Sequence, residues 1–407
     1  MKELMYIFNL LQVILFALLL VNILYLFIFA IASLFRLRVV CPKNESQKKI
    51  AVLIPGYKED KVIIDVARDA LGQNYPRDKY EVIVIADSFA DATIATLKQL
   101  PIKLVEVSFE NSTKAKALNK AMSVLPDEYD IAVVLDADNI MAPDFLSQID
   151  DFFAANSRTV AVQGHRTAKN MNTPFAILDA ISEEITNQLF RKGQRILGFS
   201  AAIIGSGVAF DYAFFKNVML QIEAIGGYDK ELEMRLLRNR HKVYYLPDAY
   251  VYDEKVQTAG AFANQRRRWL SSQFHYVRLT LGEAVKMLLT TGNLDYFNKV
   301  FQWTLLPRII ILGIVCVMIP MCIIIEQYFF GTYLTPAWII LGGVCLLSFI
   351  MLVPGKFYTI RTLKATVKIP LGLWLMFKNF FALKGANRSF IHTEHGVEAD
   401  DSFEKKK

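Results

Sequence analysis

Long apolar stretches near both ends of the chain flank a middle region of alternating short patterns. Residues 4–35 contain no charged side chain, and two further apolar runs, 309–325 and 327–355, lie on either side of Glu326. About 20 apolar residues span a bilayer as a helix. A signal peptide would have a shorter apolar core and a small-residue cleavage site, and this stretch shows neither. The pattern predicts an uncleaved N-terminal transmembrane helix within residues 1–36 and a C-terminal helix pair joined by a short outer turn at Glu326.

The shorter apolar stretch 369–383 carries Lys378. Its amphipathic pattern predicts a helix lying in the membrane interface, with a re-entrant or full crossing left open. Basic loops face the cytoplasm. The N-terminus is therefore expected outside the inner or plasma membrane, and the middle region and the polar tail 386–407 inside. The basic residues that decide this are Arg36, Arg38, Lys43, Lys48 and Lys49 after the first helix, and Lys356, Arg361, Lys364 and Lys368 after the third.

Between residues 46 and 290, strand-like apolar runs alternate with segments of helical spacing, and residues 291–385 form the C-terminal membrane region. This alternation predicts an α/β domain with a mainly parallel sheet and helices on both faces. Ligands of such sheets bind at the carboxyl ends of the strands. The expected strands are 49–55, ending in a Pro-Gly turn, 81–86, 102–107, 131–135 and 160–163; the expected helices are 62–71, 91–100, 114–125 and 143–155, the last with proline in its first turn.

Composition agrees with a membrane protein, because 54% of the residues are apolar and the mean hydropathy is positive. The net charge of +7 is explained by anionic lipid headgroups. No basic patch or known module indicates nucleic-acid binding. The four cysteines form no Cys-x-x-Cys pair, and the histidines show no zinc spacing.

The triplet Asp136-Ala137-Asp138 follows an apolar strand-like run. Strand alternation would put both carboxylates on one face, where they repel unless a cation lies between them. Mg²⁺ or Mn²⁺ with diphosphate oxygens meets that need, whereas a surface loop with two carboxylates is the alternative. We expect Asp138 to be the first metal ligand and Asp136 the second candidate, with orientation of a ribose or a metal-bound water as the favoured role of Asp136.

Gln265, Arg268 and Trp269 are spaced i, i+3, i+4, so they share one face of a helix expected around residues 262–276. Arg268 can neutralise a departing diphosphate, Trp269 can stack on a sugar, and Gln265 can hydrogen-bond either substrate. A basic amphipathic membrane helix is the alternative, and Arg266 and Arg267 fit it.

Together, Asp-x-Asp and Gln-x-x-Arg-Trp resemble the membrane-bound branch of the inverting family 2 glycosyltransferases, which includes the cellulose, chitin and hyaluronan synthases. The resemblance covers the whole chain in outline, with its motifs in the middle two thirds. It implies a GT-A type (Rossmann-like) domain on the cytoplasmic face, a UDP-sugar donor, Mg²⁺ or Mn²⁺ as cofactor, and a single in-line displacement that inverts the anomeric centre.

The resemblance also implies donor-binding residues. Pro55 to Glu59 resembles the family's Pro-x-x-x-Glu opening around the nucleoside, where Tyr57 can stack on the base. Asp87 matches an aspartate that contacts uridine; its alternative is a helix N-cap, a role that suits Asp91 better. Lys114-Ala-Lys116-Ala-Leu-Asn resembles the family's phosphate-side signature, with Lys116 as first candidate and Lys114 as second.

On the acceptor side, Ser206 and Gly207, in a Gly-Ser-Gly run expected between two helical stretches, resemble residues that line the acceptor site, together with Gln265 and Trp269. The family's Thr-Glu-Asp-x-Glu pattern places the general base on Glu231. Glutamate is a departure from the family's aspartate, and Asp229 is the other candidate.

The acceptor class stays open between a growing β-linked glycan, which we favour, and a lipid, as in ceramide glucosyltransferases. Three or four membrane segments are few for a one-chain polysaccharide channel, so a homo-oligomer or a partner subunit is considered. A degenerate, inactive membrane subunit of a glycan synthase is the non-enzyme alternative.

Overall fold

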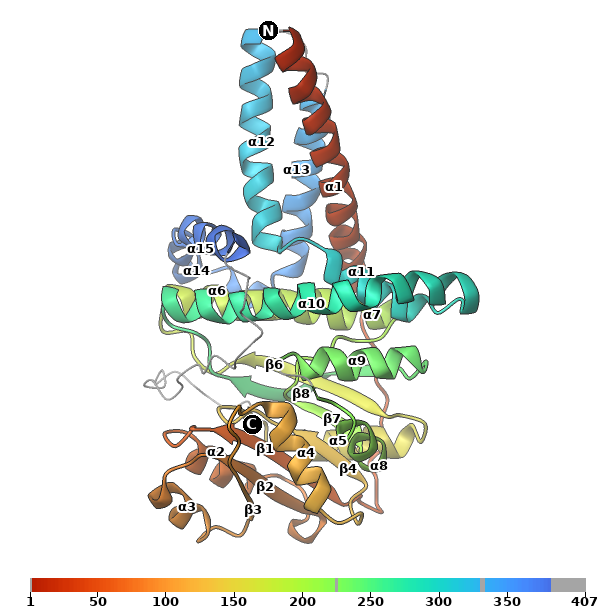
Figure 1. Ribbon diagram of the computed structural model, residues 1–407, viewed down its shortest axis with the longest axis vertical. Helices are drawn as coiled ribbons and strands as arrows, with labels where there is room; N and C mark the ends of the chain where they lie inside the picture. The colour runs from red at the N-terminus through yellow and green to blue at the C-terminus, as the bar shows by residue number, and fades with distance from the viewer. Residues whose placement is uncertain (1, 224–225, 330–333, 382–407) are drawn as a thin grey trace.

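The computed structural model describes residues 2–223, 226–329 and 334–381. Figure 1 shows a bundle of apolar helices at one end, a layer of helices lying across its base, and a sheet domain at the other end. The N-terminus lies at the tip of the bundle, far from the sheet. The predicted tail 386–407 lies outside the described residues.

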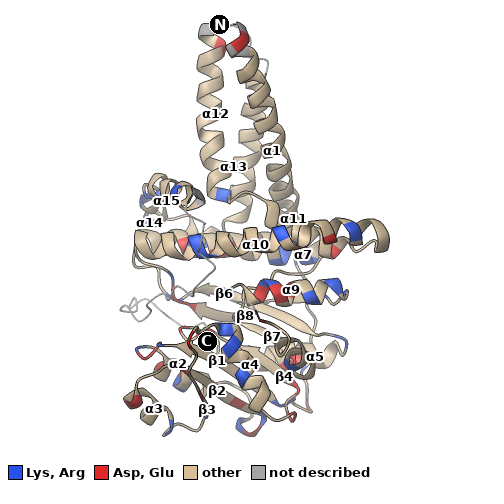
Figure 2. Cartoon of the chain, viewed as in Figure 1, with Lys and Arg blue, Asp and Glu red and all other residues tan. Residues whose placement is uncertain are grey.

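Three helices of the described chain are long and apolar enough to cross a membrane: α1 (Lys2–Leu34), α12 (Arg308–Phe329) and α13 (Thr335–Leu352). The colouring of Figure 2 places charged residues only toward the ends of this bundle. Glu326, predicted in the turn between the last two helices, instead lies within α12, because the apolar run continues past it to Phe329.

The interior of the bundle is filled by side chains. Trp338 of α13 is fully buried and packs edge-on against Phe16 of α1, with ring centroids 5.2 Å apart. Two polar residues of α1 reach distant partners: the Gln12 amide contacts Cys322 Sγ at 3.2 Å, and Asn22 Oδ1 accepts from the backbone N–H of Leu306 at 2.9 Å. These two amides of α1 are thus paired within the protein rather than exposed to lipid.

The sheet has eight strands in the order β3-β2-β1-β4-β7-β6-β8-β5. The run β3-β2-β1-β4 is parallel, β6 is parallel to β8, β7 is antiparallel to both β4 and β6, and β5 is antiparallel to β8. The predicted α/β class is confirmed, in a mixed rather than purely parallel sheet. The strands are β1 (Ile50–Tyr57), β2 (Tyr80–Asp87), β3 (Lys103–Val107), β4 (Ile131–Val134), β5 (Ile140–Met141), β6 (Ala161–Ala168), β7 (Val208–Asp211) and β8 (Val243–Asp253).

Helices cover the sheet, and apolar side chains pack against it in two separate clusters. Helix α5 begins at Phe145, so Pro143 precedes it rather than standing in its first turn. The helices of this domain are α2 (Ile63–Ala70), α3 (Asp91–Leu97), α4 (Lys114–Val124), α5 (Phe145–Ala155), α8 (Tyr212–Met219) and α9 (Tyr228–Arg238).

The Pro-Gly pair predicted to end the first strand lies inside β1. Leu53 turns its carbonyl toward β4, accepting from Leu135, and Pro55 points to the same side two residues later. Pairing with β4 ends at Leu53, so the missing N–H of Pro55 leaves no ladder bond unmade. A Cβ on Gly56 would lie 2.7 Å from the Phe89 ring, so a larger residue there would require that ring to move.

A layer of helices separates bundle from sheet (Figure 1). It contains α6 (Pro174–Thr186), which continues through a π-helical segment into α7 (Gly193–Ile196), and the 33-residue α10 (Ala259–Thr291), followed by α11 (Leu294–Thr304). Helices α14 (Ile360–Thr366) and α15 (Ile369–Phe381) lie beside the base of the bundle. The described part of α15 has 13 residues, fewer than the about 20 that span a bilayer as a straight helix.

Close packing of α7 against α1 yields a stability prediction. A Cβ on Gly193 would lie 2.5 Å from the Phe29 carbonyl oxygen, whereas one on Gly282 of α10 would meet no atom within 4 Å. We expect Gly193→Ala to destabilise the protein by about 1–3 kcal/mol through overpacking. The control Gly282→Ala should stabilise it by up to about 1 kcal/mol through helix propensity. Thermal unfolding in detergent measures both, and an unchanged midpoint for Gly193→Ala would contradict the packing.

Candidate active site

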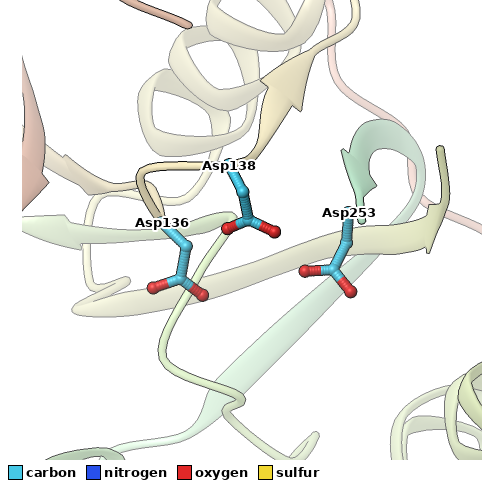
Figure 3. A group of neighbouring side chains, drawn as sticks. All are labelled: Asp136, Asp138 and Asp253. Atoms are coloured by element: carbon cyan, nitrogen blue, oxygen red, sulfur yellow. The ribbon is translucent and has the colours of Figure 1, made fainter. Parts of the chain in front are cut away.

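Three carboxylates converge at one edge of the sheet. Asp136, Asp138 and Asp253 each place a ligand oxygen within 4.8 Å of the others. Figure 3 shows the carboxylates of Asp136 and Asp138 on the loop after β4 and that of Asp253 at the end of β8, gathered around a common space. Asp138 and Asp253 are buried and Asp136 is partly exposed. Three such oxygens are a fitting donor set for Mg²⁺ or Mn²⁺.

Strand alternation, the predicted reason for this convergence, is wrong. β4 ends at Val134, and the aspartates lie in a tight turn in which the Asn139 N–H donates to the Asp136 carbonyl at 3.1 Å. The Asn139 side-chain amide then donates to Asp138 Oδ1 at 3.1 Å and to Asp253 Oδ1 at 2.9 Å. This amide ties together two loops that are far apart in sequence.

The side chain of Ser206 holds the turn that carries Asp136 through two hydrogen bonds. Its hydroxyl accepts from the Asp136 N–H at 2.8 Å and donates to Asn139 Oδ1 at 2.5 Å, and the residue is fully buried. Gly207 has φ 60°, and a Cβ there would lie 2.9 Å from Val251. The run precedes β7 rather than joining two helices. The acceptor-lining role predicted for Ser206 and Gly207 is therefore not supported, because both pack inward.

The lysine beside the carboxylates is Lys114, the second candidate. Its ammonium pairs with Asp136 and donates to the Gly205 carbonyl at 2.7 Å. The exposed Lys116 instead donates to the Asn111 carbonyl at 2.8 Å. Two residues apart on α4, the two side chains leave opposite sides of the helix. Of the two candidates, Lys114 therefore lies beside the carboxylates, and the first choice, Lys116, does not.

The predicted nucleoside-side residues share the carboxyl end of β1 and β2. Tyr57 is paired in register with Asp87, which is buried and accepts from the Ser88 hydroxyl at 2.9 Å. Pro55 is buried within β1, and the Glu59 carbonyl accepts from the first turn of α2. The N-cap of α3 is Ala90, so neither Asp87 nor Asp91 caps that helix.

Residues of α10 reach the site from the layer above. Burial lowers the pKa of Arg268, and the nearby carboxylates of Asp136 and Asp229 oppose that shift. Gln265 is half-buried, and its Oε1 has no hydrogen-bond partner. The Arg266 guanidinium lies 4.4 Å from the Trp269 ring centroid and pairs with Asp179 of α6, so Arg266 is part of the protein interior rather than of a membrane-facing surface.

The two candidates for general base point in different directions from α9. Glu231 Oε1 accepts from Arg235 on the same helix at 2.8 Å. The Asp229 Cβ lies 3.5 Å from the Cβ position of Gly205, and its charge acts on Arg268. The geometry favours Asp229 beside the carboxylate edge, in place of Glu231, which the sequence pattern favoured.

Sequence reasoning assigned no role at this site to three buried charged residues. Asp253 ends β8 within the Tyr-Asp-Glu run 252–254. A carboxylate at the end of an apolar strand is the sequence feature that could have identified it as a site residue. Arg166 Nη1 lies 3.5 Å from Asp253 Oδ1, and Lys255 Nζ lies 2.6 Å from Asp253 Oδ2. Burial would raise the pKa of Asp253, but these two cations outweigh it and lower that pKa.

Comparison with known proteins shows which family this chain resembles. A model described as "Glycosyltransferase like family 2" matches residues 47–272, more than half of the chain. A β-monoglucosyldiacylglycerol synthase of Synechocystis sp. is 26% identical over 273 residues, 64% of this chain and 55% of that protein. A poly-β-1,6-N-acetyl-D-glucosamine synthase of Staphylococcus epidermidis is 24% identical over 238 residues, 58% of this chain and 57% of that one. This chain thus matches less than two thirds of the length of these relatives.

Among solved structures, a mannosyltransferase from Pyrobaculum calidifontis in complex with GDP-Man and Mn²⁺ has a similar fold. The TM-score is 0.57 at 18% identity, covering 91% of this chain and 98% of that one.

Removing the Ser206 hydroxyl tests how the Asp136 turn is held. Ser206→Ala leaves a buried N–H and a buried amide oxygen without their partner, so we expect a loss of about 1–3 kcal/mol of stability. The control is Ser123→Ala, whose hydroxyl bonds the Lys120 carbonyl at the surface and which should stay within about 0.5 kcal/mol. Thermal unfolding compares the two, and equal midpoints would argue against a supporting role for Ser206.

Proposed function

The chain belongs to the glycosyltransferase-like family 2, and on that premise we propose that it transfers a sugar from a UDP-sugar to an acceptor at the membrane. The transfer inverts the anomeric centre and uses Mg²⁺ or Mn²⁺. The observation that carries the proposal is the convergence of Asp136, Asp138 and Asp253 with Lys114 at the carboxyl edge of the sheet. That edge is where ligands of open α/β sheets bind.

The donor is proposed to lie across this edge. Asp138, Asp253 and Asp136 would hold the cation, which when bound offsets charge on the diphosphate. Lys114 and Arg268 place fixed positive charge near the same oxygens and stabilise the departing UDP. Tyr57, Glu59 and Asp87 contact the nucleoside at the neighbouring strand ends.

The acceptor hydroxyl attacks the anomeric carbon as the bond from that carbon to the diphosphate oxygen breaks. The hydroxyl proton passes to a carboxylate, and we assign this base to Asp229 because it lies beside the site edge. Gln265 and Trp269 on α10 remain the proposed acceptor contacts.

Packing of the membrane bundle bears on the acceptor class. Trp338 and its neighbours fill the space between α1, α12 and α13. An extended glycan leaving through this chain needs a polar passage, which a second copy or a partner subunit would have to provide. The packing therefore favours a lipid or lipid-linked acceptor that stays on the catalytic side over the growing β-linked glycan predicted first. The names of the relatives cover both classes.

The membrane placement follows from charge. Basic residues follow α1 and α13 on the side of the sheet domain, and basic loops remain cytoplasmic. We propose an integral protein of the cell membrane with its catalytic domain in the cytoplasm, where nucleotide sugars are made, and its N-terminus outside.

The decisive assay supplies purified protein in lipid nanodiscs with Mn²⁺ or Mg²⁺, labelled UDP-sugars and membrane lipid. We expect Asp138→Asn to lower the transfer rate by about a thousandfold, because several kcal/mol of charge stabilisation is lost, and Arg268→Ala to lower it comparably. A small, organic-extractable product identifies a lipid acceptor, and a large, glycosidase-sensitive product identifies a polysaccharide. No transfer from any donor by the unaltered protein would reject the proposal in favour of an inactive subunit.

Two matched substitutions test the base. Asp229→Asn should lower kcat by about 10²–10⁴-fold, the usual contribution of proton transfer, whereas Glu231→Gln, which loses only a contact to Arg235, should lower it less than about tenfold. Steady-state kinetics with a saturating donor measure both. The opposite order would return the base to Glu231.

A further inference from the structure

Two buried cations stand against the carboxylate triad on its inner side. Arg166 of β6 lies 3.5 Å from Asp253 and 4.0 Å from Asp136, and Lys255 lies 2.6 Å from Asp253. Their side chains are only 10% and 2% exposed. Because both side chains are buried, water and dissolved ions cannot screen their charges from the triad unless the protein rearranges.

Glu183 of α6 holds these cations in place from the layer above the sheet. It accepts from Arg166 Nη2 at 2.8 Å, lies 3.7 Å from Lys255 Nζ, and pairs with Arg191 Nη1 at 3.2 Å. Burial would raise the pKa of Glu183, but Arg166, Lys255 and Arg191 together lower it well below its usual value. The glutamate is therefore charged, and it prevents Arg166 and Lys255 from turning away from the triad.

The formal charges of the triad and of the side chains paired around it cancel. Four carboxylates, those of Asp136, Asp138, Asp253 and Glu183, stand against the four cations Lys114, Arg166, Lys255 and Arg191. A divalent cation that entered alone would leave a doubly positive cluster in a poorly solvated place, which is costly. A nucleoside diphosphate brings the negative charge that restores the balance.

Arg166 also has an unused donor. Its Nε is buried and has no hydrogen-bond partner, although both of its terminal nitrogens are engaged. A buried N–H without an acceptor costs about 1–3 kcal/mol. An anionic oxygen is the acceptor that a guanidinium binds most strongly.

We propose that Arg166 and Lys255 are resident counter-ions of the triad, which make binding of the divalent cation depend on the nucleoside diphosphate and the reverse. Arg166 in addition contacts the diphosphate. This rests on the proposed function, because it assumes that a nucleotide sugar binds at the triad. The cation and the diphosphate then enter the site as a unit, and neither occupies it firmly alone.

Calorimetry on the full-length protein in nanodiscs tests the coupling without turnover. Mn²⁺ is titrated with and without saturating UDP, and UDP with and without saturating Mn²⁺. We expect each ligand to tighten the other by at least about tenfold, and by the same factor in both directions, since coupling free energy is reciprocal.

Substitutions then assign the coupling to the two cations. Lys255→Met removes one buried positive charge, so Mn²⁺ alone should bind about tenfold more tightly and the coupling factor should shrink. Arg166→Lys keeps the charge but removes Nε, so the coupling should persist while Mn²⁺-dependent UDP affinity falls about tenfold. Lys98→Met is the control, because the exposed Lys98 pairs with Glu106 and with none of these side chains; it should change neither constant.

Equal Mn²⁺ affinity with and without UDP would overturn the inference, as would an unchanged Mn²⁺ affinity in a folded Lys255→Met protein. The second outcome leaves the proposed function untouched, whereas the first would also argue against the proposed role of the cation beside the diphosphate. Absence of UDP binding by the unaltered protein under all conditions would overturn the proposed function and this inference with it. Coupled binding without sugar transfer would support the inference and reject only the proposed catalytic activity.

Discussion

Mutual repulsion of three carboxylates held within 4.8 Å is the constraint around which the rest of the site is built. In a partly buried position such repulsion is weakly screened by water. The Asn139 amide, the Lys114 ammonium and the Arg166 guanidinium each offset part of it from a different element. Their positions in turn depend on the Ser206 hydroxyl, the start of α4 and the Glu183 carboxylate. The site is thus one connected group of charges.

This group continues into the layer beneath the membrane bundle. Glu183 and its neighbour Glu184 both lie on α6. The Glu184 carboxylate accepts hydrogen bonds from His165 Nε2 and from Lys356, a residue that follows α13. Burial would raise the pKa of Glu184, but His165 and Lys356 outweigh it and lower that pKa. Charges that organise the site are therefore continuous with charges that anchor the base of the bundle. The membrane helices and the sheet domain form one electrostatic structure.

Local patterns in the sequence were sufficient for the α/β class and the three long apolar helices. They brought Asp136 and Asp138 together, but through a strand alternation that β4, which ends at Val134, does not provide. They failed where the answer depended on partners distant in the chain. Asp253 joins the triad through the bridging amide of Asn139, 114 residues earlier, and no spacing rule relates the two. The choice between Lys114 and Lys116 depended on which face of α4 meets the Gly205 loop. Pro55 was read as a strand end because the early end of β4 cannot be seen in the sequence of β1.

Pairing of α1 with the C-terminal helices constrains the order in which the protein can be completed. Gln12 and Asn22 face partners that lie 310 and 284 residues later in the chain. During synthesis the first helix enters the bilayer long before Cys322 and Leu306 have been made. Its two side-chain amides must therefore remain unpaired in lipid or form temporary hydrogen bonds. A chain that stops before its last helices would keep those amides unsatisfied. The same contacts that close the bundle thereby distinguish a finished molecule from a truncated one while it is still in the membrane.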